Sequence, residues 1–289
     1  MKNFCHGSKV KKTCLYMLLL SFMGALSACG HMFYYPTQGM YVDVNKLEPR
    51  PQQIEFETSD KKKVIGWYFQ PESKKAKARL LYFHGNGQNL SSHFIGLYWI
   101  LKEDYEFMIF DYPGYGGSEG EPTQQSTTDS GKKALEWLNQ QEPQLPVVIF
   151  GQSLGGNVAL YTAATTKDPN TCMVVVESTF KSYPKVAQRV MAGHWTTWLF
   201  QLFPYLVISD SYSANNVIQD IAPTPLIVIH GDADPIVKIK NGEDVFAAAK
   251  APKEFWKVPG GGHIQAFTGD HKEVFRKQLV AALEKNCKK

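Results

Sequence analysis

Residues Val147–Gly156 read Val-Val-Ile-Phe-Gly-Gln-Ser-Leu-Gly-Gly, and this stretch decides the fold. Its four apolar residues predict a buried strand ending at Gly151, and the run from 157 to 164 predicts a helix. Gly-x-Ser-x-Gly between a strand and a helix is the context in which a serine is presented on a sharp turn as a nucleophile. The glycines fit because a Cβ atom beside such a turn would collide with the strand or the helix. Ser153 is therefore the candidate nucleophile.

The start of the chain has the features of a signal peptide. Four lysines precede an apolar run over residues 15–23, and the small residues Ser27 and Ala28 follow. The apolar run is too short for a membrane-spanning helix. We predict a signal peptide over residues 1–28.

The residues around the expected cleavage site resemble a bacterial lipobox, Leu26-Ser27-Ala28-Cys29. The resemblance implies that Cys29 becomes the lipid-modified first residue of the mature protein. Gly30 follows it, rather than the aspartate associated with inner-membrane retention, so the resemblance implies an outer-membrane lipoprotein of the bacterial envelope. The alternative is an ordinary secreted protein cleaved near Ala28.

Residues 29–50 contain prolines, aromatic residues and polar residues without a helical period, and we expect a tether between the lipid and the folded body. Its tyrosines, Tyr34, Tyr35 and Tyr41, either touch the membrane interface or dock on the domain. The folded domain is expected over residues 51–289.

Charge and cysteine content exclude some classes of partner. Removing residues 1–28 takes four of the 31 lysines and arginines and no acid, which leaves 27 to balance the 27 acidic residues. A neutral mature chain gives no reason to expect nucleic acid as a partner.

No metal site is expected, because the sequence has no C-x-x-C or H-E-x-x-H spacing. Cys172 and Cys287 remain in the mature chain, and in an oxidising compartment they either pair or stay as buried thiols.

Short apolar strands alternate with helical segments through the mature chain. Strands are expected at 53–58, 63–69, 79–83, 107–110, 147–150, 173–176, 226–229 and 254–258, with the first two forming an antiparallel hairpin. Helices are expected at 90–101, 123–139 and 272–285, besides the one that follows Ser153. This alternation predicts an α/β fold, with a mostly parallel eight-stranded sheet covered by helices on both faces.

A long insertion, residues 179–222, separates two of the expected strands. Its large apolar side chains are Trp195, Trp198, Leu199, Phe200, Leu202, Phe203, Tyr205 and Leu206. An insertion at the carboxyl end of a parallel strand lies on the ligand-binding side of the sheet. We expect a small helical cap whose aromatic residues both pack on the body and line an apolar pocket above the serine.

A serine hydroxyl becomes a good nucleophile when a base, usually a histidine oriented by a carboxylate, takes its proton. His263 is the preferred base, because it follows three glycines after the last expected strand and can reach back to the edge of the sheet. His84 and His230 each precede a glycine at a strand end and are expected to brace loops. His194, in the cap, and His271, at the start of a helix, are weaker candidates.

The orienting acid is expected on a loop at the carboxyl end of a strand. Asp234 is preferred, since it lies far enough beyond its strand to turn inward, while Asp232 is expected to cap the turn. Glu177 is the rival, and its alternative role is to bind the backbone of a loop.

The order Ser153, Asp234, His263 is that of the α/β-hydrolase fold. The motifs His84-Gly-Asn-Gly, Asp111-Tyr-Pro-Gly-Tyr-Gly, Gly151-Gln-Ser-Leu-Gly-Gly and His230-Gly-x-x-Asp-x-x-Val resemble those of the α/β-hydrolase superfamily, in order across residues 50–285. They are most similar to the small-capped serine hydrolases that include depalmitoylase-like enzymes. Lys238 departs from the pattern, because a proline often follows the valine.

The resemblance implies an oxyanion hole built from the backbone N–H groups of Asn86 and Leu154. It also implies acyl transfer through an acyl-enzyme on Ser153, without a cofactor. The leading hypothesis is a monomeric, lipid-anchored serine hydrolase acting on small carboxylic ester or thioester substrates. One alternative is a serine aminopeptidase, which needs an acidic cap residue such as Asp210 or Asp220 to bind the substrate amine. The other is a non-catalytic binding protein of the envelope.

Overall fold

The computed structural model describes residues 33–288. The expected signal peptide and Cys29 lie outside the described residues. The main sheet contains β2 (Gln52–Glu57), β3 (Lys63–Phe69), β4 (Arg79–Phe83), β6 (Glu106–Phe110), β7 (Val147–Gln152), β8 (Thr171–Glu177), β9 (Leu226–Gly231) and β10 (Lys253–Val258). Its eight strands follow the order β10-β9-β8-β7-β4-β6-β3-β2.

The sheet is mostly parallel. All neighbouring pairs from β10 to β6 are parallel, and β3 alone runs against the others, pairing antiparallel with β6 and β2. The expected N-terminal hairpin is therefore β2–β3. The central strands β4, β6 and β7 are buried along their whole length, in keeping with their continuous apolar sequences. The α/β-hydrolase fold and its eight-stranded sheet are confirmed.

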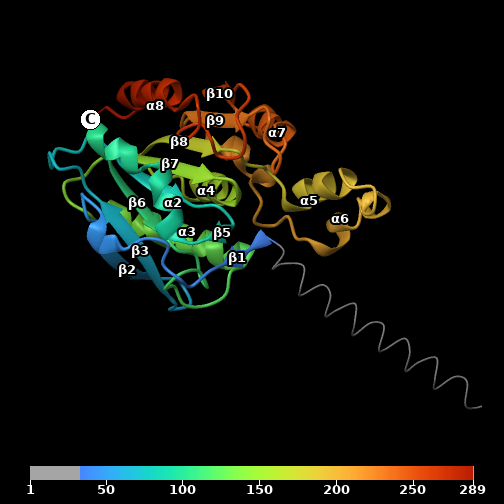
Figure 1. Ribbon diagram of the computed structural model, residues 1–289, viewed down its shortest axis with the longest axis horizontal. Coiled ribbons are helices and arrows are strands. Elements are labelled where there is room, and N and C mark those ends of the chain that lie inside the picture. The colour runs from blue at the N-terminus through green and yellow to red at the C-terminus, as the bar shows by residue number, and fades with distance from the viewer. Residues whose placement is uncertain (1–32, 289) are drawn as a thin grey trace, which may run out of the picture.

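Helices cover both faces of the sheet (Figure 1). Apolar residues of α3 (Gln124–Asn139), α4 (Leu154–Thr166) and α7 (Lys240–Ala248) pack in one core cluster, and those of α8 (Lys272–Asn286) pack in a second. Thr123 starts α3 with a capping box, because its hydroxyl accepts from the Ser126 N–H while the Ser126 hydroxyl accepts from the Thr123 N–H. No helix within residues 33–288 combines the length and the hydropathy needed to cross a bilayer.

The segment expected to be helical over residues 90–101 is helical, but only its first turn is an α-helix. The segment begins as the short α2 (Leu90–His93) and continues as the 3₁₀ helices η3 (Phe94–Gly96) and η4 (Tyr98–Glu103). Leu97, Ile100 and Leu101 are buried in the second cluster, so the apolar spacing correctly marked the inward face. The apolar spacing does not distinguish an α-helix from short 3₁₀ turns.

The described part of the expected tether docks on the domain. Residues Tyr35–Pro36 form β1, which pairs with β5 (Gly87–Gln88) in the loop after β4, and η2 (Val44–Lys46) follows. Tyr34 is buried, whereas Tyr35 and Tyr41 are exposed. Of the two roles considered for these tyrosines, Tyr34 therefore has the docking role.

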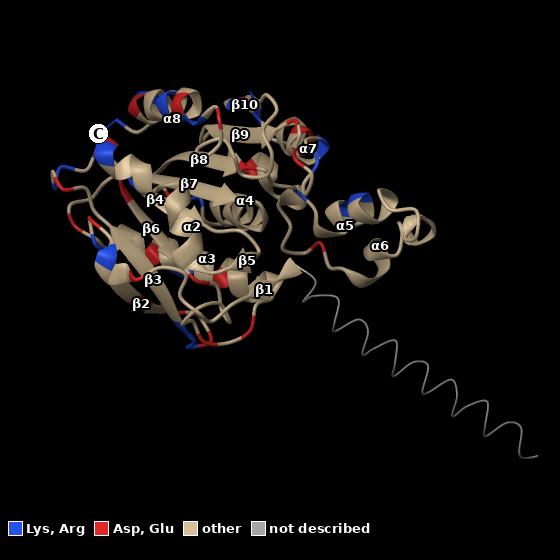
Figure 2. Ribbon diagram, viewed as in Figure 1, with Lys and Arg blue, Asp and Glu red and all other residues tan. Residues whose placement is uncertain are grey.

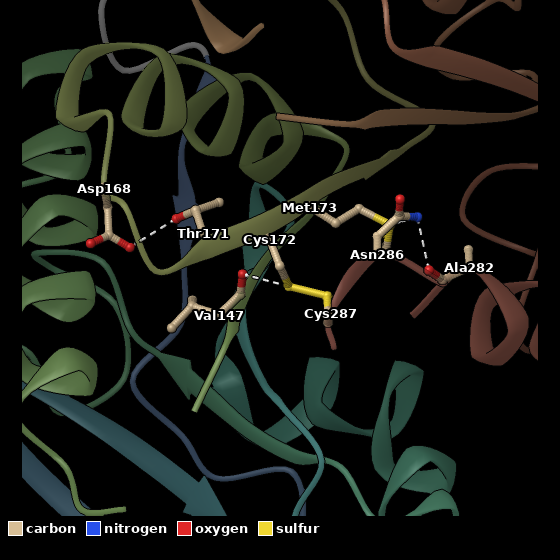
Figure 3. Close-up of a disulfide and its surroundings, with 8 residues drawn as sticks. All are labelled: Val147, Asp168, Thr171, Cys172, Met173, Ala282, Asn286 and Cys287. Atoms are coloured by element: carbon tan, nitrogen blue, oxygen red, sulfur yellow. Dashed lines mark hydrogen bonds between the residues drawn. A yellow bond between two sulfur atoms is a disulfide. The ribbon is translucent and has the colours of Figure 1, made fainter. Parts of the chain in front are cut away.

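Cys172 and Cys287 form a disulfide, with their Cα atoms 5.2 Å apart (Figure 3). Cys172 lies near the start of β8, and Cys287 directly follows α8. The bond fastens the last helix to the amino end of the central strands. This is the end of the sheet opposite to Ser153, since the carboxyl end of β8 pairs with the end of β7.

The insertion between β8 and β9 contains α5 (Tyr183–Ala192), η5 (Trp198–Phe200), α6 (Pro204–Val207), η6 (Ala214–Asn216) and η7 (Ile218–Ile221). Figure 1 shows α5 and α6 standing out from the body. The expectation that the cap aromatics pack on the body is wrong for most of them, because Trp195 is 90% exposed and Phe200 is 61% exposed. The helical period of this insertion does not determine whether its apolar side faces the domain.

Candidate active site

Ser153 lies on a strained turn between β7 and α4. Its backbone adopts φ 54° and ψ −121°, a conformation that costs free energy in a residue with a Cβ atom. The turn is tight because Gly155 packs directly on β4, where an added Cβ would lie 2.2 Å from the Phe83 carbonyl oxygen. Gly151 is equally constrained, with an added Cβ 2.6 Å from the Gly155 oxygen. The sequence Gly-x-Ser-x-Gly thus fixes the backbone around the serine.

The Ser153 side chain does not cap its helix. Serine at this position usually accepts a backbone N–H of the first turn, but no side-chain capping bond forms at the start of α4. Instead the Ser153 Oγ lies 3.0 Å from His263 Nε2. The strained backbone therefore directs the hydroxyl away from its own helix and towards the histidine.

The structure brings together the three side chains expected from the sequence. His263 Nδ1 lies 2.8 Å from Asp234 Oδ2, on the side of the ring opposite to Ser153. An Nδ1–H donating to the carboxylate leaves Nε2 free to accept the serine proton, which is the arrangement that activates a serine. Asp234 is fully buried, whereas the His263 side chain is 15% exposed.

The second oxygen of Asp234 is fixed by the backbone. Asp234 Oδ1 accepts hydrogen bonds from the N–H groups of Ile236 and Val237, each 2.9 Å away. Burial by itself raises the pKa of Asp234, but the hydrogen bond and charge of His263 together with these N–H groups lower the pKa below 3.8. Asp234 is therefore ionised at neutral pH and holds the Nδ1–H tautomer of His263.

The two other candidate acids have different roles. Asp232 accepts from the Gly260 N–H at 2.7 Å and pairs with Lys257, so it braces a surface turn as expected. Glu177 is buried and accepts from the Ala266 N–H at 2.7 Å. The backbone of the loop that carries His263 is thus the partner of Glu177, which was the alternative role considered for it.

The two expected oxyanion donors come from different segments of the chain. Leu154 is the first residue of α4, so its N–H has no acceptor within the helix. Asn86 lies in the loop after β4, and its carbonyl accepts from the Tyr115 hydroxyl at 2.6 Å and the Tyr35 N–H at 2.9 Å. The neighbouring Gly85 lies beside the serine, since a Cβ added to it would be in van der Waals contact with the Ser153 Cβ at 3.8 Å.

Buried histidines brace the loops, as expected for His84 and His230. His84 Nδ1 lies 2.8 Å from the Gly85 oxygen, and His230 Nε2 lies 2.6 Å from the Val237 oxygen. Burial lowers the pKa of both imidazoles, so they are neutral. His93 has the same kind of role, with Nε2 2.9 Å from the Gly87 oxygen, and no motif around His93 pointed to it.

A buried chain of polar side chains behind Ser153 was also missed. The Tyr82 hydroxyl donates to Gln152 Oε1, and Gln152 Nε2 donates to Glu177 Oε2 at 2.6 Å. Through Glu177 the chain reaches the Ala266 N–H in the His263 loop. The only available signal was a glutamine beside the candidate nucleophile, and its partner came from another strand.

Two surface grooves lie outside this group of residues. A groove of about 1040 Å³ lies between the 95–104 segment and α8, and one of about 830 Å³ lies beside the start of α3. Neither groove is lined by Ser153, Asp234 or His263. Among the residues that the structure describes, no group of histidine, cysteine and acidic side chains is arranged to hold a metal ion.

Comparison with known proteins places this geometry in a family. Residues 74–222 match the family described as serine aminopeptidase, S33. The protein YfhR of Escherichia coli strain K12 is 31% identical over 258 residues, which are 86% of this chain and 85% of that protein. The lysophosphatidylserine lipase ABHD12 of Macaca fascicularis is 28% identical over 201 residues, which are 65% of this chain and 49% of that protein.

Solved structures share the fold. The Pyrococcus furiosus esterase Pf2001 has a TM-score of 0.69 at 18% identity, covering 89% of this chain and all of that one. Est1E of Butyrivibrio proteoclasticus, solved with ferulic acid, has a TM-score of 0.63 at 13% identity, covering 81% of this chain and 98% of that one. The family match and the YfhR relationship show that this chain belongs to the serine aminopeptidase S33 family of the α/β-hydrolase superfamily.

Proposed function

We propose that the protein is a serine hydrolase that cleaves carboxylic esters or thioesters, held at the bacterial outer membrane by a lipid on Cys29. The observation that carries the catalytic part is the alignment of Ser153 Oγ, His263 Nε2 and the Asp234 carboxylate, at 3.0 Å and 2.8 Å. The lipase and esterase names among the relatives and fold neighbours support the choice of acyl substrates. The lipobox resemblance supports the anchor.

In the proposed mechanism, His263 Nε2 takes the hydroxyl proton as Ser153 Oγ attacks the substrate carbonyl. Asp234 stabilises the imidazolium that forms. The N–H groups of Asn86 and Leu154 bind the developing oxyanion, and the position of Leu154 at the start of α4 adds the favourable end of the helix dipole. His263 then protonates the leaving group, and water hydrolyses the acyl-enzyme by the reverse transfers.

Labelling with a fluorophosphonate probe tests the proposal, because the probe reacts with an activated serine. We expect labelling of the wild type and none of Ser153→Ala. Ser130→Ala is the matched control, since Ser130 is a buried serine whose hydroxyl donates to the Thr127 carbonyl inside α3. A wild-type protein that does not label would contradict the enzyme proposal.

Substrate class is tested separately. A series of nitrophenyl esters and acyl thioesters of increasing chain length is compared with aminoacyl nitroanilides. We expect hydrolysis of the acyl compounds to exceed that of the nitroanilides by at least about a hundredfold in kcat/KM, a difference of about 3 kcal/mol in transition-state binding. Faster cleavage of the nitroanilides would favour the aminopeptidase alternative.

A further inference from the structure

The outer part of the cap presents a large apolar surface to solvent. We define this surface, the cap face, by its exposed residues: Trp195, Trp198, Leu199, Phe200, Leu202, Phe203, Tyr205 and Leu206. Trp195 is 90% exposed and Leu199 is 80% exposed. Apolar patches of this kind on a soluble domain mark sites that bind a membrane or a protein.

The cap face is also free of formal charge. Residues 190–209 contain no lysine, arginine, aspartate or glutamate, and the lysines and arginine of the cap are confined to Lys181, Lys185 and Arg189. Lys185 and Arg189 are already paired with Asp244, at 2.7 and 2.8 Å. Figure 2 shows blue on α5 and an uncharged α6 beyond it. Burying this face in lipid therefore removes no charged side chain from water.

Many backbone N–H groups of the cap face are already hydrogen-bonded within the cap, so these groups can enter an apolar environment without losing partners. They bond to nearby carbonyls in short helical turns, as in Phe200 to Thr197, Phe203 to Phe200 and Leu206 to Phe203, each at 2.9 Å. Few unpaired amide groups then enter the lipid, where each would be costly. Trp and Tyr side chains are the residues favoured at the boundary between acyl chains and water.

The start of the described chain lies at the base of the cap. Phe33 packs edge-on against Tyr183, the first residue of α5, with ring centroids 5.0 Å apart. Cys29 precedes Phe33 by four residues, which span about 14 Å at full extension. A lipid on Cys29 would thus hold the bilayer close to α5, and the Tyr205 hydroxyl bonds α6 to Gln188 of α5 at 3.0 Å.

We propose that the cap face inserts into the surface of the lipid bilayer and acts as a second membrane anchor beside the acylated cysteine. This inference rests on the proposed lipid-anchored hydrolase and adds the orientation of the molecule on the membrane. The lipid by itself holds the protein at the membrane without fixing which face meets the bilayer, and an inserted aromatic surface adds a second attachment that does. Because the cap follows the strand end next to Ser153, insertion turns the candidate active site towards the bilayer, where acyl lipids are concentrated.

Tryptophan quenching by brominated lipids tests the proposal. The mature protein, isolated from membranes, is reconstituted into vesicles of phosphatidylethanolamine and phosphatidylcholine with or without brominated acyl chains. Bromine quenches tryptophan only within the bilayer, and Trp67, Trp99, Trp137 and Trp256 are buried or half-buried in the body. We expect brominated vesicles to quench the tryptophan fluorescence of the wild type. Most of this quenching should be absent in the double variant Trp195→Phe/Trp198→Phe.

Two further variants compare the removal of apolar side chains from the cap face with the removal of an exposed apolar side chain from α8. Leu199→Ser/Phe200→Ser should reduce the bromolipid quenching of the two cap tryptophans by about twofold or more, because the removed side chains would otherwise be buried in lipid. Val274→Ser is the control, since Val274 is 62% exposed on α8. It should keep wild-type quenching. Thermal unfolding of each variant verifies that it is folded.

Several outcomes overturn the proposal: failure of the protein to float with vesicles, quenching that does not depend on bromine, or quenching that survives loss of both cap tryptophans. A dimer in sedimentation, with these tryptophans shielded from acrylamide and no bromolipid quenching, would instead assign the cap face to a second copy. Fluorophosphonate labelling on the same vesicles separates the proposals. Labelling without quenching contradicts only the insertion, and quenching without labelling contradicts only the hydrolase.

Discussion

The carboxylate of Glu177 accepts a hydrogen bond from the backbone N–H of Ala266, 2.7 Å away and three residues beyond His263. Its other oxygen accepts from Gln152, the neighbour of Ser153 in the chain. One buried side chain therefore connects the strand that carries the candidate nucleophile to the loop that carries the candidate base. Burial raises the pKa of Glu177, against the lowering effect of these bonds.

Glu177→Gln should disturb this connection, because a glutamine has one acceptor oxygen for two donors. An unmatched buried donor costs about 1–3 kcal/mol. We expect kcat for a nitrophenyl ester to fall by about 10- to 100-fold while KM stays nearly constant. Glu254→Gln, at a surface strand position, is the control and should keep wild-type kcat. An unchanged kcat in Glu177→Gln would show that the His263 loop needs no such support.

Asp234→Asn tests the orienting acid. The asparagine oxygen can still accept from the Ile236 and Val237 N–H groups, which leaves its amide NH₂ facing His263 Nδ1. His263 would then carry its proton on Nε2 and could not accept the serine proton. We expect kcat/KM to fall by about 10⁴-fold with little change in fold stability. Asp232→Asn should change kcat/KM by less than about twofold, because surface groups away from the site have small effects.

Gly155→Ala tests the packing of the serine turn. The new methyl group would lie 2.2 Å from the Phe83 oxygen and 2.3 Å from the His84 oxygen, so the turn must move. Overpacking of this kind costs about 1–3 kcal/mol or more, and fluorophosphonate labelling should be largely lost. Gly87→Ala is the control from the adjacent loop, where an added Cβ meets nothing within 4 Å. Equal labelling of the two variants would contradict the packing argument.

Cys172→Ser/Cys287→Ser should lower stability without altering activity. The disulfide joins residues 115 positions apart, and releasing a loop of this length costs about 2–5 kcal/mol of the free energy of unfolding. It lies at the end of the sheet opposite to Ser153. We expect a lower midpoint in thermal or urea unfolding and unchanged kcat/KM at 25 °C. A loss of activity in the folded double variant would contradict this separation.

Asp111 should make stability depend on pH. Burial raises its pKa from 3.8 to about 7 in the folded protein, despite the backbone N–H groups of Leu90 and Gly117. Between these values the folded chain holds a proton that the unfolded chain has lost, so the contribution of Asp111 is full below pH 3.8 and declines as the pH rises towards 7.

Asp111→Asn cannot ionise, so its free energy of unfolding should decline less than that of the wild type over this pH interval. The asparagine oxygen can still accept from the Leu90 N–H, which bonds Asp111 Oδ1 at 2.7 Å. Urea unfolding of both proteins at several pH values provides the measurement. Parallel pH profiles for the two proteins would show that Asp111 does not retain its proton in the folded state.

The sequence by itself determined the order and type of most strands, because a strand buried on both faces must be a continuous apolar run. It also determined Ser153, since glycines on both sides of a serine after such a run permit few structures other than a strained turn. His263 and Asp234 followed as expectations from loop position, because the carboxyl ends of parallel strands meet at one edge of the sheet.

Tertiary structure alone decided which partner each polar group took. Glu177 is the last residue of β8 and Asp234 follows the end of β9, and only the three-dimensional path of the loops puts one beside the Ala266 N–H and the other against His263. The disulfide and the outward-facing cap were decided in the same way. Hydrophobic periodicity records which side chains avoid water within a segment, but contacts between distant segments, and whether an apolar face is covered by protein, depend on how the whole chain packs.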